Sequence, residues 1–223
     1  MLILLHHGLF PENCFPSYFY YTVHCESIRR LESNIYPGAG GKGGESLTYA
    51  IDRDAATHFI RASVNTPSVN TFLLVSALSS RRNKASWWDD ASWSLVQKIN
   101  SEIMPHYYAA KLAADEALTV LGEKRREKDG DFRYLILRPG QLSDDPEVGK
   151  VSLGRTAARG SISRADVAGV ADALLAEKKA NGWFDLLGGE EKIEEAVERV
   201  VKSGANDIEG EDTKVMEDNL IQY

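Results

Sequence analysis

Two short β-rich runs constrain the fold of this chain more than any other feature of its sequence. Thr71–Val75 is an unbroken apolar run, and Phe132–Leu137 is a second candidate for a buried strand. Apolar runs without alternation are typical of strands that are covered on both faces, as in parallel sheets. A third such run, Trp183–Leu187, follows. In parallel sheets ligands bind beyond the carboxyl ends of the strands, so the residues after Val75 and Leu137 are the first candidates for a site.

Helical patterns fill the segments around these runs. Asp89 and Asp90 can cap one helix, and Ser163 with Asp166 forms a capping box for another. The first helix follows a glycine-rich segment, and its apolar stripe is predicted to be Leu47, Ala50, Ile51, Ala55 and Phe59. The helices are expected over about 47–61, 89–102, 105–126, 163–179 and 190–202. Alternation of strands and helices predicts crossover units, and therefore an α/β fold with a parallel sheet.

The two ends of the chain differ from this pattern. Residues 1–35 hold both cysteines and three of the five histidines, with short strands predicted at Leu2–Leu5 and Phe19–Val23. The spacing of the cysteines and histidines fits no standard zinc pattern, so we expect no metal site. Residues 206–223 are acidic and polar, and are predicted to form a flexible tail.

Composition excludes several classes of partner. Lys and Arg total 26 against 33 Asp and Glu, which gives a net charge of −7 and a pI near 5.3. An acidic chain argues against nucleic acid or an anionic membrane as the main partner. No apolar run approaches the roughly 18 residues that a membrane span needs. Two cysteines cannot form a disulfide framework, so we expect a soluble protein in the reducing cytoplasm.

One helix carries the clearest candidates for chemistry. Tyr107 and Lys111 are four residues apart and share a face with the apolar residues that pack on the sheet. One interpretation is a core tyrosine beside a lysine whose stem is buried. The other is a tyrosine general acid whose pKa is lowered by the neighbouring ammonium. Ser76 ends the first buried run, where its hydroxyl could face the same crevice, although a strand-end serine is more often only a turn residue.

Several segments together resemble a known family. The order and spacing are similar to the later half of the atypical and extended short-chain dehydrogenase/reductases, in the NAD(P)H-binding, NmrA-like branch that includes biliverdin reductase B. The resemblance covers about residues 36–203. The segments that carry it are Ala39–Gly44, Tyr49–Ala56, Leu74–Ala77, Tyr107–Lys111, Leu137–Gly140 and Ile162–Ala168.

The resemblance implies a Rossmann-like three-layer sandwich and assigns roles by position. Ser76 would orient a substrate carbonyl or hydroxyl, Tyr107 would exchange the proton, and Lys111 would hold the nicotinamide ribose and lower the tyrosine pKa. The cofactor would be NADP or NAD. The residues implied to lie along it are Gly38, Ala39, Gly40, Arg138, Pro139, Gly140 and Leu142.

The chain departs from the family pattern at its N-terminus. The family's pyrophosphate-binding glycine turn follows the first strand, but residues 1–35 contain a single glycine, Gly8. Gly38–Gly43 matches the dinucleotide fingerprint by letter, but the resemblance places it after the family's fourth strand. The chain therefore resembles a member whose first βαβ half is missing or replaced. Loss of those strands would expose a sheet edge, which predicts poor solubility or a homodimer that covers the edge.

Three functional hypotheses follow. The first is an NAD(P)-dependent oxidoreductase that moves hydride between a nicotinamide and a small carbonyl, alcohol or flavin-like acceptor. The second is a non-catalytic module that senses dinucleotides or binds a partner, and the third is a truncated fragment without cofactor binding. The expected organisation is an atypical segment over 1–35, a Rossmann-like NAD(P)-binding domain over 36–205, and the tail over 206–223.

Overall fold

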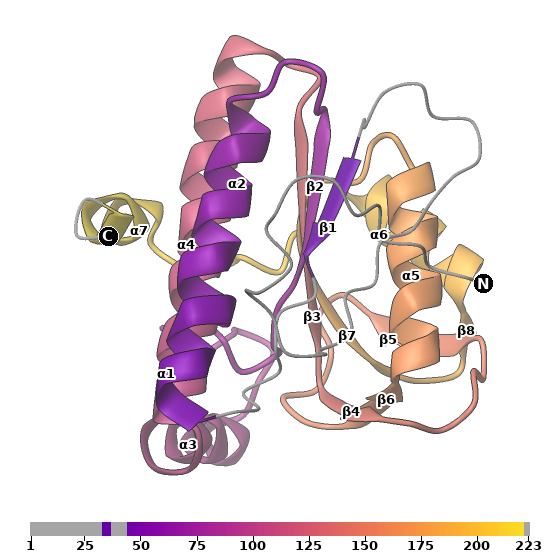
Figure 1. The fold of residues 1–223 in the computed structure, drawn as a ribbon. Coiled ribbons are helices and arrows are strands. Elements are labelled where there is room, and N and C mark those ends of the chain that lie inside the picture. The colour runs from indigo at the N-terminus through magenta and orange to yellow at the C-terminus, as the bar shows by residue number, and fades with distance from the viewer. Residues whose placement is uncertain (1–32, 37–43, 221–223) are drawn as a thin grey trace.

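The computed structural model describes residues 33–36 and 44–220, so the strands expected before residue 33 lie outside the described residues. A six-stranded sheet forms the centre, in the order β1-β2-β3-β7-β5-β8 (Figure 1). β1 (Ser33–Tyr36), β2 (Thr71–Val75), β3 (Arg133–Pro139) and β7 (Gly182–Gly188) run parallel. β5 (Lys150–Leu153) and β8 (Glu191–Lys192) join antiparallel to complete a mainly parallel sheet.

Apolar cores cover both faces of the sheet, which confirms the three-layer α/β prediction. Leu73, Leu135 and Leu137 pack on one face against α5 (Arg164–Ala176) and α6 (Ile193–Ser203). Phe72, Leu74 and Ile136 pack on the other face against α2 (Ala56–Val64) and α4 (Pro105–Lys128). Alternate residues of one strand therefore enter different cores, which explains why these strands are apolar throughout.

The first described strand was missed by the sequence analysis. β1 pairs in register with β2, with Ile35 opposite Leu73, and it lies immediately before the glycine-rich segment. β1 has four residues and begins with the polar residues Ser33 and Asn34. Such a run is too short and too polar to indicate a buried strand. Among the described strands β1 forms the edge of the sheet. A homodimer that covers this edge stays a prediction.

The helix after the glycine-rich segment is rotated relative to the prediction. It comprises α1 (Gly44–Thr48), the π-helical segment η1 (Tyr49–Ala55) and α2. The fully buried positions are Thr48, Asp52, Ala56 and Ile60, whereas Phe59 is exposed. A π-helical turn contains an extra residue and shifts the register of everything beyond it. The buried stripe is displaced by one residue from the predicted stripe, beginning at Thr48 of α1, and this displacement places Asp52 on the inner side.

The other helices confirm most of the predicted capping. Asp89 caps α3 (Asp90–Lys98), which continues through the π-helical segment η2 (Ile99–Ile103). Ser163 caps α5 through the backbone N–H of Asp166. A small parallel pair, β4 (Gln141–Ser143) with β6 (Ser161–Ser163), precedes α5. α5 ends three residues before the expected position, and α6 begins later than expected because Glu191 and Lys192 form β8.

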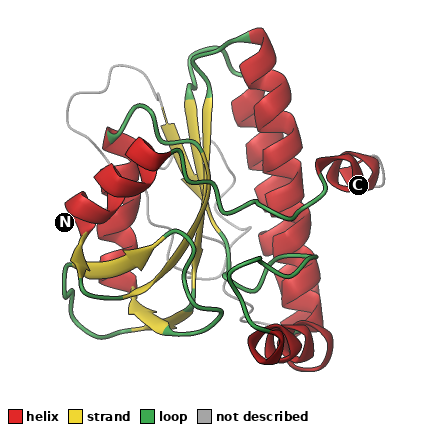
Figure 2. Cartoon of the chain, turned by 180° about the vertical axis from the view of Figure 1, so that it is seen from behind, coloured by secondary structure: helices red, strands yellow, loops and turns green. Residues whose placement is uncertain are grey.

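The C-terminal segment differs from the expectation of a flexible tail. Asn206–Glu211, which we call the C-terminal strap, leads from α6 to α7 (Thr213–Leu220), which lies against α4 (Figure 2). Met216 of α7 is fully buried in the core that α2 and α4 share. Ile208 of the strap and Leu220 of α7 pack against the same core. These apolar side chains dock a segment that is acidic on average, and composition alone did not reveal them.

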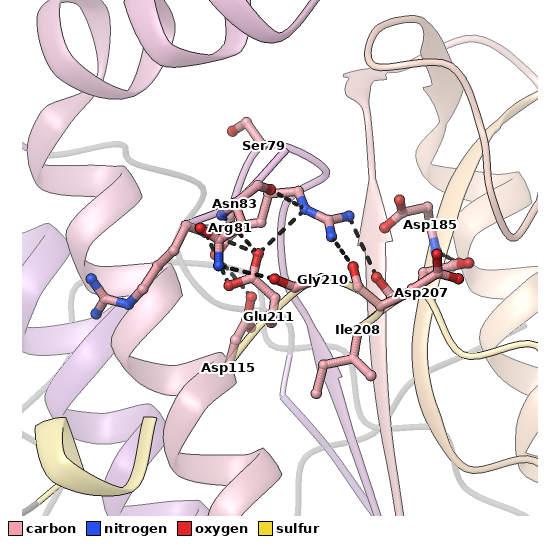
Figure 3. Close-up of polar contacts among 12 residues, drawn as sticks. Ser79, Arg81, Asn83, Asp115, Asp185, Asp207, Ile208, Gly210 and Glu211 are labelled. Atoms are coloured by element: carbon pink, nitrogen blue, oxygen red, sulfur yellow. Dashed lines mark hydrogen bonds and ion pairs between the residues drawn. The ribbon is translucent and has the colours of Figure 1, made fainter. Parts of the chain in front are cut away.

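Polar contacts join the strap to the sheet and to the loop after β2. The carboxylate of Asp207 accepts hydrogen bonds from the backbone N–H of Asp185 at 2.7 Å and of Arg155 at 2.9 Å. Arg81 donates to the carbonyls of Asp207 and Glu209 and pairs with Glu211 at 3.4 Å (Figure 3). Both side chains of the Arg81–Glu211 pair are fully buried. The strap therefore closes over a buried charged group.

Candidate functional site

The sheet-facing side of α4 carries three polar residues at successive turns. Tyr107, Lys111 and Asp115 follow one another at intervals of four, so they share a face. Ala110, Ala114 and Leu118 beside them are buried, as the predicted stripe requires. The structure thus confirms that Tyr107 and Lys111 lie on the stripe that packs toward the sheet. The polar side chains meet the carboxyl end of β2, where a parallel sheet presents its ligand site.

Lys111 is fixed against the end of β2. Its ammonium donates a hydrogen bond to the carbonyl of Val75 at 2.7 Å, and the side chain is 2% exposed. The carboxylate of Asp52, from η1, lies 3.6 Å from the same nitrogen and is also buried. A buried ammonium needs such partners because desolvation of an unpaired charge is costly. Sequence analysis missed Asp52, because the predicted apolar stripe lies one residue away from the face that is buried.

Tyr107 does not have the lowered pKa that the acid–base interpretation expected. Burial raises the pKa of its hydroxyl above the usual 10.0, and the negative charges of Asp52 and Asp115 raise it further. A carboxylate disfavours a second negative charge nearby, so the phenol of Tyr107 stays protonated at neutral pH. Lys111 does not lower the pKa of Tyr107, because its ammonium is directed to Val75 and Asp52.

Ser76 lies where the sequence predicted, but its hydroxyl is already engaged. It donates to Oδ2 of Asp115 at 2.7 Å, and the same oxygen accepts the hydroxyl of Ser80 at 2.8 Å. Ser76 is 3% exposed and Asp115 is fully buried. Burial raises the pKa of Asp115 to about 6, while Arg138, Ser76, Lys111 and Ser80 each lower it. Sequence analysis did not single out Asp115; the signal was an acidic residue on the apolar stripe, one turn after Lys111.

Arg138 occupies a different place from the one that the resemblance implies. Its Nε lies 3.0 Å from Oδ1 of Asp185, and both side chains are fully buried. Cζ of its guanidinium lies over the ring of Trp183, 4.3 Å from the ring centroid. Nη2 of the same group donates a hydrogen bond to the carbonyl of Leu78 at 2.8 Å. Side chains alternate along a strand, so this residue of β3 points into the interior toward α4. The side chain therefore belongs to a buried ion pair rather than to the surface of a crevice.

The other residues implied to line a cofactor are distributed as follows. Pro139 is buried, and Leu142 of β4 is half-buried against the core under α5 and α6. Gly140 is packed so closely that an added Cβ would lie 2.4 Å from Leu187 and 2.5 Å from the carbonyl of Gly160. Gly38, Ala39 and Gly40 lie outside the described residues. Close packing is thus a sufficient reason for a glycine at position 140.

Gly140→Ala is expected to lower the free energy of unfolding by about 1–3 kcal/mol, since overpacking costs that much in a rigid surrounding. Urea unfolding in the absence of nucleotide measures it. Gly130→Ala is the matched control, because a Cβ there meets nothing within 4 Å. Equal unfolding midpoints for the two variants would show that the contact with Gly160 relaxes without cost.

The described residues contain neither a metal-binding cluster nor a membrane-spanning helix. Across residues 33–36 and 44–220, no group of three or more His, Cys, Asp or Glu side chains is arranged to hold a metal ion. In the same part of the chain, no helix is long and apolar enough to cross a membrane.

The sequence matches known proteins over the region that forms this site. The model of a family described as NAD(P)H-binding matches residues 35–178. The Bacillus subtilis protein named uncharacterized sugar epimerase YhfK is 34% identical over 164 residues, which are 73% of this chain and 65% of that protein. A UPF0659 protein from Schizosaccharomyces pombe is 33% identical over 134 residues, 59% of this chain and 51% of that protein. The chain thus spans less than two thirds of the length of these curated relatives.

Solved structures show the same fold. A Bacillus halodurans protein assigned as an NAD-dependent epimerase/dehydratase has a TM-score of 0.56 and 27% identity, covering 73% of this chain and 66% of that one. The oxidoreductase ylbE from Lactococcus lactis has a TM-score of 0.56 and 23% identity, covering 77% of this chain and 68% of that one. At 23% identity, the similarity to ylbE shows a shared fold alone.

Proposed function

The chain belongs to this NAD(P)H-binding, oxidoreductase- and epimerase-like family, and from that premise we propose that it is an NAD(P)-dependent oxidoreductase acting on a small carbonyl, alcohol or flavin-like acceptor. Tyr107 exchanges the proton, and Lys111 holds the nicotinamide ribose. The observation that carries the proposal is the fixed placement of this pair at the carboxyl end of β2, with the ammonium of Lys111 bound to the carbonyl of Val75.

The residues present fit the nicotinamide end of the family's cofactor, NAD(P)H. The ammonium of Lys111 has three N–H donors; one is bound to Val75 and one faces Asp52. The third N–H donor of Lys111 is the one assigned to a ribose hydroxyl. When bound, the nicotinamide supplies or accepts a hydride. Among the described residues we assign none to the pyrophosphate and adenosine end.

Each residue of the proposed site has a defined task. The protonated hydroxyl of Tyr107 is a donor for an oxygen that develops negative charge during reduction. Lys111 orients the ribose, and its buried position excludes water from the site. Ser76 lies next to Val75 in the chain and completes the polar end of β2. The small-molecule substrate is part of the proposal, as are the roles of these three residues.

Tyr107→Phe is expected to lower turnover by about 100-fold or more, since a positioned general acid contributes 10²–10⁴. NAD(P)H oxidation with a panel of small aldehydes, ketones and flavins measures it. Tyr108→Phe is the matched control, because Tyr108 donates from the next position of α4 to the carbonyl of Arg81. If both variants retain the turnover of the unmodified protein, Tyr107 is not the acid.

Cofactor binding is tested separately by thermal unfolding with NADPH and with NADH. A nucleotide at about 100 times its dissociation constant adds about 2.7 kcal/mol, which raises the midpoint of a protein of this size by roughly 5–10 °C. Tyr107→Phe is expected to keep that shift. A sharp transition that neither nucleotide moves would contradict the proposal and favour a truncated fragment without cofactor binding.

One observation favours a second candidate, a non-catalytic module that senses dinucleotides or binds a partner. The hydroxyl of Ser76 is nearly inaccessible and is turned toward Asp115 rather than toward a ligand. A thermal shift with NADPH, combined with no turnover of any acceptor in the panel, would support this candidate over the enzyme.

A further inference from the structure

Asp115 lies at the centre of the polar contacts around the end of β2. One of its oxygens, Oδ2, accepts the hydroxyls of both Ser76 and Ser80. Its other oxygen is buried and has no hydrogen-bond partner among the described residues. Shape alone does not require a carboxylate here, because an apolar side chain would avoid the cost of burying a charge. The buried acid therefore calls for an explanation beyond packing.

We propose that Asp115 is a positioning residue for Tyr107 and Ser76: its carboxylate fixes the direction of the Ser76 hydroxyl and keeps a negative charge on the face of α4 that carries Tyr107. The inference deepens the proposed function and rests on it for the identity of the reacting group. Asp115 itself is not expected to touch the substrate.

The first consequence concerns hydrogen-bond polarity. A serine hydroxyl has one proton, and Ser76 gives it to Asp115, while its backbone N–H donates to the carbonyl of Leu137 at 2.7 Å. A ligand group that reaches Oγ of Ser76 must therefore be a donor, such as a hydroxyl. Tyr107 faces the opposite requirement, because its phenol is a donor for a carbonyl oxygen.

The second consequence concerns charge. The carboxylates that face Tyr107 are Asp52 of η1 and Asp115 of α4. The cations are Lys111, which is held by Val75 and Asp52, and Arg138 of β3, which faces Asp115 and Asp185. Each cation thus has a carboxylate partner of its own.

The reaction considered is the reduction of a carbonyl, in which the phenol of Tyr107 begins protonated. When bound, NAD(P)H would supply a hydride to the carbonyl carbon and would be oxidised to NAD(P)⁺, as the C=O π bond breaks. The carbonyl oxygen gains the proton of Tyr107, and the phenolate then recovers a proton from water. A phenol that holds its proton at neutral pH begins this sequence in the required state, whereas oxidation needs the phenolate first.

The test follows the ionisation of Tyr107 in the free protein, without nucleotide. Absorbance of tyrosinate is recorded against pH for each protein, and the curve of its Tyr107→Phe version is subtracted. Asp115→Asn removes the negative charge and keeps the shape, so the Tyr107 midpoint is expected to fall to a lower pH. Glu127→Gln is the matched control, because Glu127 is an exposed acid on the same helix. The same midpoint in Asp115→Asn and in the unmodified protein would overturn the proposal.

A second measurement uses conservative variants and keeps the test decisive if Asp115→Asn fails to fold. The carbon-13 shift of the Asp115 carboxyl is titrated in the unmodified protein and in Ser76→Ala. Loss of a hydrogen bond to the carboxylate is expected to raise the midpoint. An unchanged midpoint would show that Ser76 does not donate to Asp115, and would overturn the proposal. Failure of NADPH to bind would instead refute the proposed function, and leaves both titrations interpretable.

Discussion

Arg138→Met is expected to lower the free energy of unfolding by about 3–5 kcal/mol, because without its partner the buried Asp185 must either keep an uncompensated charge or bind a proton. Arg138 and Asp185 are both fully buried and lie 3.0 Å apart. Methionine keeps most of the side-chain volume that covers Trp183, so the effect reports the lost charge rather than a cavity. Urea unfolding at pH 7, followed by tryptophan fluorescence, measures it.

The pH dependence of this deficit has a definite sign. Burial raises the pKa of Asp185 from 3.8 to about 7, although Arg138 opposes the rise; without Arg138 the pKa rises further. A carboxyl with a raised pKa in the folded state binds more protons than it does in the unfolded state. Stability is therefore lost as the pH rises above about 4. The deficit of Arg138→Met is expected to be larger at pH 8 than at pH 5.

A double variant provides the control. Arg138→Met with Asp185→Leu replaces the ion pair by apolar groups, which is often neutral or stabilising. We expect the double variant to recover most of the stability that Arg138→Met loses. The free-energy effects of the two changes should therefore depart from additivity by more than those of independent sites do. A double variant as unstable as the sum of its single changes would show that the two side chains act separately.

Arg81→Met is expected to cost about 3 kcal/mol and to release the C-terminal strap. The change removes the hydrogen bonds to the carbonyls of Asp207 and Glu209 and leaves Glu211 buried without its cation. Hydrogen exchange of the backbone amides from Asp207 to Met216 is therefore expected to become faster than that of β2 and β3. Peptide-resolved exchange measures the difference directly.

An exposed ion pair of the same strap gives the matched control. Arg155 lies 2.6 Å from Glu209, but the two side chains are 61% and 46% exposed. Such a pair is worth about 0–1 kcal/mol, so Arg155→Met should leave both stability and exchange nearly unchanged. If Arg81→Met behaves like Arg155→Met, the strap is held by α7 rather than by Arg81.

Much of the fold could be predicted because its signals are local. Thr71–Val75 and Trp183–Leu187 form strands within one residue of the predicted bounds, and Asp89 and Ser163 cap the expected helices. Continuous apolar runs and capping residues act within a few positions of the chain. The family was identified for the same reason, because its motifs are short and their order is preserved.

Other features depend on contacts between distant segments. Whether Arg138 lines a crevice or enters an ion pair depends on Asp185, which is on a neighbouring strand. The buried face of residues 44–64 includes the polar Thr48 and Asp52, which an apolar period does not indicate. The acidic C-terminal segment is ordered because Arg81 and the core beneath Met216 hold it.

The sequence by itself therefore determined the layers, the parallel strands and the placement of Tyr107 and Lys111 on one helix face, since periodicity fixes which residues share a side. Only the tertiary structure decided the ionisation and hydrogen bonding of that face. Asp52 and Asp115 come from different helices and raise the pKa of Tyr107, while Ser76 is turned away by its bond to Asp115. Electrostatic effects depend on distance and burial in space, which spacing along the chain does not specify.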